Sequence, residues 1–183
     1  MADTSNEIWS EYHPTAIAVL KGLIVVIEIG CLWGQYVLVV ASGDFIQVYP
    51  EFAPARWPYA IAGILGVLCF EAALVPLWHL LTLVKRRDVF SGKAVTWTNA
   101  IIVCALAEAA IVVFVLLYGS IAQFPYRDPS SGQYVDLAMG SAALGVACLG
   151  ALLLIAAFIL LLIVMRSLLV TAIAQRSELA EVI

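Results

Sequence analysis

Three acidic residues interrupt the long apolar stretches of this sequence, and they are the residues best suited to chemistry. They are Glu28, Glu71 and Glu108, near the centres of the stretches 15–41, 58–84 and 96–120. An ionised side chain at the centre of a bilayer costs on the order of 2.5–3.5 kcal/mol. Protonating an ordinary glutamate at pH 7 costs about 3.7 kcal/mol, which is comparable. If antiparallel helices bring the three carboxyls to one level, their repulsion favours a shared proton or a bound cation.

The same glutamates have two other interpretations. They could make a polar contact to a cationic helix of a partner protein. Alternatively, they could be hydrogen-bonded clamps between helices that fix the geometry of a bundle. The sequence leaves these alternatives open. We therefore expect a candidate intramembrane proton, cation or interhelical polar site formed by Glu28, Glu71, Glu108 and Gln35.

Polar residues recur every seven positions in the first apolar stretch. They are Lys21, Glu28, Gln35 and Ser42. In a helix a seven-residue step drifts by only about 20°, so the four share one face, which should point inward or at a partner. Lys21 lies about 10 Å along the axis from Glu28, too far for an ion pair, and is expected to extend to the cytoplasmic interface.

The familiar enzymatic and metal-binding motifs do not occur. The two histidines, His13 and His79, do not form an HExxH pattern, and no CxxC pair is present. The four cysteines fall one in each apolar stretch, where cysteine usually acts as a small hydrophobic residue. We also find no GxSxG, phosphate-binding or dinucleotide-binding motif. We expect no catalytic residue, no cofactor and no metal ion, and hence no enzyme.

Composition indicates the environment that must hold these residues. Hydrophobic residues make up 64 % of the 183 residues, and charged residues only 12 %. Soluble proteins have about 45–50 % apolar and about 25 % charged residues. The net charge of −4 provides no basic field, so nucleic acid is not expected as a direct partner. The sequence therefore predicts an integral membrane protein.

Four stretches are long enough to cross a hydrocarbon core of roughly 30 Å as helices. The predicted spans are 15–41, 58–84, 96–120 and 135–165. Short connections favour antiparallel neighbours, so the predicted fold is all-α, an up-down-up-down four-helix bundle. We treat 1–183 as a single membrane domain, with 166–183 as an amphipathic helical tail.

Lysine and arginine predict the threading, because cytoplasmic loops carry their excess. The connection between the second and third spans contains Lys85, Arg86, Arg87 and Lys93, whereas the other two connections contain one arginine each. Arg166 and Arg176 follow the fourth span and are expected on the same side. Both termini are therefore predicted to be cytoplasmic.

The segment VPLWHLLTLVKRRDVFSGKAVTWTNAI resembles a bacterial family of small four-span membrane proteins classed as a domain of unknown function. The matching features are Pro76, the basic turn, the tripeptide 89–91 (VFS) and Asn99, together with the C-terminal segment MRSLLVTAIAQRSELAEVI. Some members are encoded beside a short helix-turn-helix regulator of the Xre type. The resemblance implies the four-span fold and a bacterial inner membrane.

The basic turn has a physical role of its own. Arg86 and Arg87 favour anionic lipid by roughly 1 kcal/mol each, and Phe90 can anchor the turn at the headgroups. These three residues are the candidate cytoplasmic contact to lipid or a partner.

The sequence thus predicts a non-enzymatic accessory, sensing or interaction subunit of the bacterial cytoplasmic membrane. Its expected partners are the lipid bilayer and either another membrane protein or further copies of itself. The alternative is a proton- or cation-coupled transport component that uses the glutamates.

Overall fold

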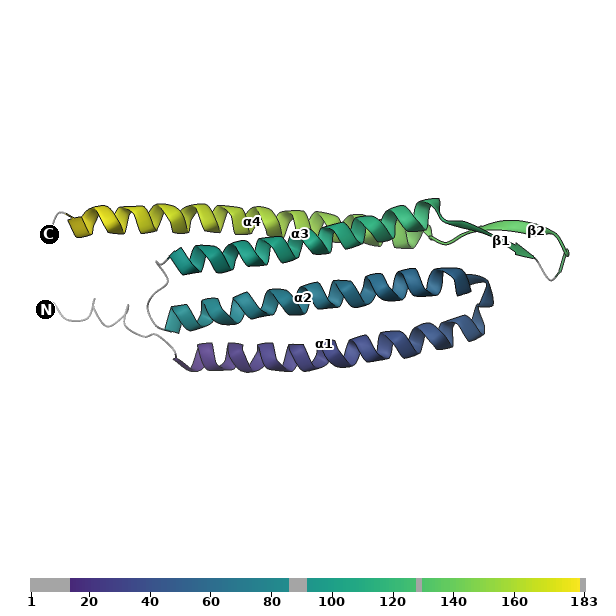
Figure 1. The fold of residues 1–183 in the computed structure, drawn as a ribbon, viewed down its shortest axis with the longest axis horizontal. Helices are drawn as coiled ribbons and strands as arrows, with labels where there is room; N and C mark the ends of the chain where they lie inside the picture. Colours follow the sequence, from purple (N-terminus) through teal and green to yellow (C-terminus); the bar gives the residue numbers. More distant parts are fainter. Residues whose placement is uncertain (1–13, 86–91, 128–129, 182–183) are drawn as a thin grey trace, which may run out of the picture.

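The computed structural model describes residues 14–85, 92–127 and 130–181, which form four long helices and a short β-hairpin (Figure 1). In chain order the elements are α1 (Pro14–Val48), the 3₁₀ helix η1 (Pro50–Ala55), α2 (Arg56–Lys85), α3 (Gly92–Ile121), β1 (Gln123–Arg127), β2 (Tyr134–Ala138) and α4 (Ala142–Glu181).

Four helices are long and apolar enough to cross a membrane, with mean hydropathy between 2.2 and 3.1. Their outer surfaces carry large apolar side chains, such as Leu153, which is 73 % exposed, and Trp33, which is 68 % exposed. Such surfaces suit contact with hydrocarbon rather than water. The predicted all-α fold with four apolar helices is confirmed, and these helices are those of a multi-pass membrane protein.

The helices pack in the order of the chain. α1 packs on α2, α2 on α3, and α3 on α4, and successive helices run antiparallel (Figure 1). α1 and α4 do not form a comparable interface, so the bundle is open on one side. Many of the buried residues are small, as expected for helices that associate through close packing in lipid. Examples are Ala60 and Ala62 of α2 and Ala94 of α3.

The connection between α3 and α4 differs from the sequence prediction. Residues 134–138 form strand β2, which pairs antiparallel with β1, so α4 begins at Ala142 and not at residue 135. Asp136 and the alternating burial of β1 suit a ribbon outside the hydrocarbon. Gly132, with φ 68°, takes a turn conformation that favours glycine. The hairpin projects from one end of the helices (Figure 1).

α4 is the longest helix, with 40 residues. At 1.5 Å per residue it spans about 60 Å, roughly twice a hydrocarbon core. Its sequence contains neither proline nor glycine after Gly150, so nothing in the backbone ends it earlier. The helix therefore continues through the predicted tail as far as Glu181, at the same end of the molecule as the start of α1 (Figure 1).

Candidate intramembrane carboxyl site

The polar stripe of α1 faces α2 along its whole length. Lys21 Nζ donates a hydrogen bond of 2.8 Å to Thr82 Oγ1 and lies 4.7 Å from the centre of the Trp78 ring. At the opposite end, Ser42 Oγ accepts a hydrogen bond of 3.4 Å from Arg56 Nε. The prediction that the seven-residue repeat forms one inward face is confirmed.

Between these two contacts, Gln35 reaches the first of the candidate carboxyls. Gln35 Nε2 donates a hydrogen bond of 3.1 Å to Glu71 Oε2. The other oxygen of that carboxyl, Oε1, is buried and has no hydrogen-bond partner among the described residues. Glu71 is therefore a clamp between α1 and α2 through only one of its two oxygens.

Glu28 lies on the same interface but nearer the start of α1. It lines a small cavity together with Leu74, Trp78 and His79 of α2. His79 donates from Nδ1 to the carbonyl oxygen of Val75 at 2.9 Å, because a carbonyl can only accept. Its ring also stacks on Trp97, with centroids 4.2 Å apart. His79 is thus held at the interface of α2 and α3.

Glu108 of α3 contacts α2 at a glycine. A Cβ atom built on Gly66 would lie 3.2 Å from Glu108 Oε1, so the missing side chain makes room for the carboxyl. Glu108 Oε2 is buried and lacks a hydrogen-bond partner in the described ranges. Glu108 also lines a cavity of about 500 Å³ to which all four helices contribute, which we name the central cavity. Its lining includes Cys31, Gly66, Cys69, Cys104, Glu108 and Leu154.

The three glutamates are staggered along the helix axis. At 1.5 Å per residue, Glu28 lies about 10 Å along α1 from Gln35, which marks the level of Glu71. Gly66, which marks the level of Glu108, lies about 7–8 Å along α2 from Glu71 in the other direction. The sequence predicted that the three carboxyls lie at one level of the membrane. In the structure they do not. Glu71 and Glu108 are the closer pair in axial position.

Three of the four cysteines meet at the central cavity, which sequence reasoning did not anticipate. Cys31, Cys69 and Cys104 come from three different helices and line it beside Glu108. All are free thiols. In the described part of the chain, no three histidine, cysteine or acidic side chains lie close enough to hold a metal ion. The sequence could have indicated this cluster, because the three cysteines lie at similar depths in three antiparallel spans.

The candidate cytoplasmic contact, Arg86, Arg87 and Phe90, lies outside the described residues. What the described residues provide is a central cavity with apolar walls and a carboxyl that has an unpartnered oxygen. A buried polar group without a partner in hydrocarbon costs several kcal/mol. A carboxyl in this position is therefore prepared to accept a hydrogen bond, a proton or a cation from another molecule.

Residues 40–183 match a family of proteins described as "Protein of unknown function (DUF2975)". The matched part begins near the end of α1 and includes Glu71 and Glu108 but not Glu28 or Gln35. No curated protein and no solved structure matches the chain.

Proposed function

The chain belongs to the DUF2975 family, and we propose that it is a non-enzymatic interaction subunit of the bacterial cytoplasmic membrane. In this proposal it binds a transmembrane helix of a partner in the open side of the bundle, between α1 and α4. The observation that carries the proposal is that Glu108, which lines the central cavity, has a buried carboxyl oxygen, Oε2, with no partner among the described residues.

The open packing supports this role. Because α1 and α4 do not pack on each other, the central cavity lies between Cys31 of α1 and Leu154 of α4. A partner helix there would cover apolar surface and bring a hydrogen-bond donor to the carboxyl of Glu108. Hydrogen bonds between membrane helices contribute on the order of 1 kcal/mol each, and close packing contributes the rest. The partner helix should therefore carry a basic, amide or hydroxyl side chain at mid-membrane depth.

Site-specific photo-crosslinking in cells tests the proposal. Leu153 and Leu154 are adjacent on α4 and are 73 % and 74 % exposed, but only Leu154 is among the residues that line the central cavity. A photoreactive residue at position 154 should yield an adduct of one defined mass, and the same residue at 153 should yield lipid adducts only. An adduct of twice the chain mass identifies a second copy as the partner. Equal labelling from both positions would contradict the proposal.

The chemistry of the contact is tested by Glu108 variants. Glu108→Leu should abolish the adduct at position 154, because the acceptor is lost. Glu108→Gln should retain most of it, because an amide still accepts and donates hydrogen bonds. If Glu108→Leu crosslinks as well as the parent chain, the carboxyl does not hold the partner.

A second candidate function is proton- or cation-coupled transport. It is favoured by one observation: Glu108 lines not only the central cavity but also a neighbouring cavity of about 430 Å³ that extends toward Tyr59. In proteoliposomes with an imposed pH gradient, transport through this carboxyl predicts proton flux that Glu108→Gln removes. If the parent protein shows no proton flux, the transport function is contradicted and the interaction function is favoured.

A further inference from the structure

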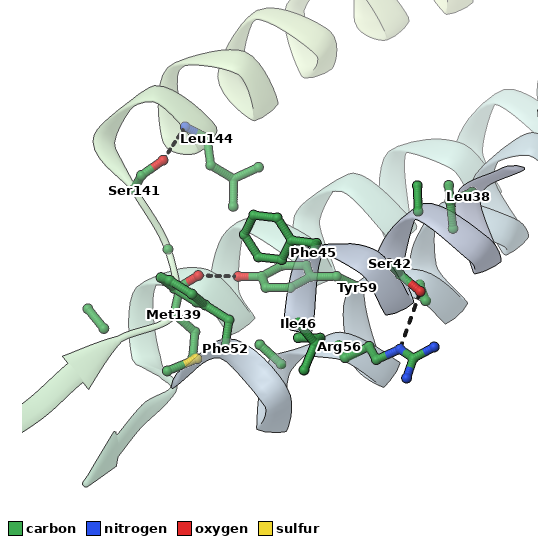
Figure 2. A pocket seen from close by; sticks show the side chains of 15 residues that line it. Leu38, Ser42, Phe45, Ile46, Phe52, Arg56, Tyr59, Met139, Ser141 and Leu144 are labelled. Carbon is green, nitrogen blue, oxygen red and sulfur yellow. Dashed lines mark hydrogen bonds between the residues drawn. The ribbon is translucent and has the colours of Figure 1, made fainter. Parts of the chain in front are cut away.

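A second large cavity lies at the hairpin end of the helices (Figure 2), and none of the three glutamates is among the residues that line it. We name it the hairpin-end cavity; its volume is about 780 Å³, within the range of roughly 300–1,000 Å³ typical of small-molecule sites. Its lining comes from the last turns of α1, from η1, from the first turns of α2 and from the segment before α4. It includes Leu38, Phe45, Phe52, Arg56, Tyr59 and Met139.

The walls of this cavity are fixed by contacts that do not depend on a ligand. Tyr59 donates a hydrogen bond of 3.0 Å from its hydroxyl to the carbonyl oxygen of Met139, which ties α2 to the segment between β2 and α4 (Figure 2). The rings of Phe45 and Phe52 lie 5.9 Å apart and join α1 to η1. A preformed apolar cavity reduces the entropy lost on binding. In a membrane, its natural contents are hydrocarbon chains.

Arg56 provides the charged group of this cavity. Its side chain is half-buried, its Nε contacts Ser42 Oγ at 3.4 Å, and its guanidinium carbon lies 5.2 Å from the centre of the Trp57 ring. Among the described residues no carboxylate pairs with it, although Asp44 and Glu51 lie in the neighbouring segments. The guanidinium has five N–H donors, and Ser42 accepts from only one. Figure 2 shows Arg56 and Ser42 on the side of the cavity opposite Met139.

The position of Arg56 along the helix indicates what it meets. It is the first residue of α2; Trp57 follows it directly, and Tyr49 precedes it by seven residues. Aromatic residues of this kind concentrate at the level of lipid headgroups, so the guanidinium lies where phosphates are found. Arginine binds phosphate through two parallel N–H···O bonds, which satisfy donors that are otherwise free.

We propose that the hairpin-end cavity binds one anionic glycerophospholipid, with its phosphate on Arg56 and an acyl chain along Leu38 and Phe45. The apolar lining favours a phosphate that carries acyl chains over free inorganic phosphate. This site is independent of the proposed partner helix, since Glu108 is not among the residues that line it. The lipid would belong to the leaflet on the hairpin side of the membrane.

Native mass spectrometry of the purified full chain, after addition of phosphatidylglycerol or phosphatidylcholine, tests the headgroup. The parent should retain one phosphatidylglycerol, and Arg56→Gln should weaken its binding by about tenfold or more, the loss of a charge-assisted contact. Arg127→Gln is the matched control, because Arg127 lies on β1 at the same end and is exposed. It should bind as the parent does. Arg56→Lys keeps the positive charge but loses the two parallel N–H donors of the guanidinium, so it should bind with intermediate affinity.

A pair of alanines on α1 tests the acyl chain. Ala41 lines the cavity, whereas Ala18, also exposed on α1, does not. Ala41→Trp should reduce phosphatidylglycerol binding several-fold, and Ala18→Trp should not; unchanged helical circular dichroism shows that each variant is folded.

Equal retention of the two lipids, or unchanged binding by Arg56→Gln, would overturn the proposal. Displacement of the lipid by millimolar inorganic phosphate would also overturn it and indicate a simple anion site. Glu108→Leu should leave lipid binding unchanged, which separates this test from that of the partner helix.

Discussion

Gln35 and Glu71 show how the polar residues of α1 act within the membrane. The single hydrogen bond of 3.1 Å between them joins α1 to α2 at mid-depth, where water cannot compete. Similar contacts lie above and below it, at Lys21 and Ser42. α1 is thus attached through polar side chains along one face. Because α2 is the one long helix among the described elements on which α1 packs extensively, these contacts should matter more for the position of α1 than they would in a closed bundle.

This attachment makes a prediction for Gln35→Leu. The substitution should lower the free energy of unfolding by about 0.5–2 kcal/mol, since the hydrogen bond between helices is lost and a second oxygen of Glu71 loses its partner. The measurement is unfolding in mixed micelles followed by circular dichroism. In the background of Glu71→Leu, the same change should cost little more, because the interaction is already absent. Additive losses in the two variants would show that the hydrogen bond does not form.

Part of this site could be predicted from the sequence. The seven-residue repeat identified the inward face of α1, because helix geometry alone determines which residues share a face. The axial stagger of Glu28, Glu71 and Glu108 depends on how far each helix slides against the next, and no local pattern encodes that offset. The space above Gly66 that accommodates the Glu108 carboxyl depends on how α2 packs against α3, so the sequence alone could not predict it.

The β-hairpin shows the corresponding limit for elements. Apart from Asp136, residues 135–139 are apolar and lead into the apolar run of α4, so hydropathy alone extended the fourth span over them. Local signals for the hairpin were present: the aromatic residues Phe124 and Tyr126 occupy alternate positions along β1, and Gly132 follows two serines at the turn. The four helices were recognised because each has many more apolar residues than a short strand.

The junction between α3 and α4 gives a prediction at this scale. A Cβ atom on Gly140 would collide with the backbone of Gly119, so these two glycines allow the chain to return closely from the hairpin. Gly140→Ala should therefore lower the free energy of unfolding by about 1–3 kcal/mol, as overpacking typically does. Gly145→Ala is the control, because a Cβ atom there meets nothing within 4 Å. Equal stability of the two variants, measured by thermal unfolding in detergent, would show that the close approach is absent.

The whole molecule has an open side, and this is the feature that short connections could not predict. Connection length determines that consecutive helices are antiparallel neighbours, but it does not decide whether the first and last helices meet. Here the central cavity lies between α1 and α4. The hairpin-end cavity lies where α1 ends and α4 begins. The central cavity thus exists because the bundle does not close.

Threading of the whole chain supplies the last prediction. The start of α1, the end of α2, the start of α3 and the end of α4 lie at one end of the molecule, and the hairpin lies at the other (Figure 1). Because Lys85, Arg86, Arg87 and Lys93 lie close together in the sequence where α2 ends and α3 begins, that end should face the cytoplasm. Reporter enzymes fused after Arg87 and after Ile183 should show cytoplasmic activity, and those after Pro50 and Pro129 should show exterior activity. The reverse pattern would invert the chain and would place Arg56 and its lipid in the cytoplasmic leaflet. A cytoplasmic result at Pro50 alone would mean that α1 does not cross the membrane, which would contradict the four-span fold.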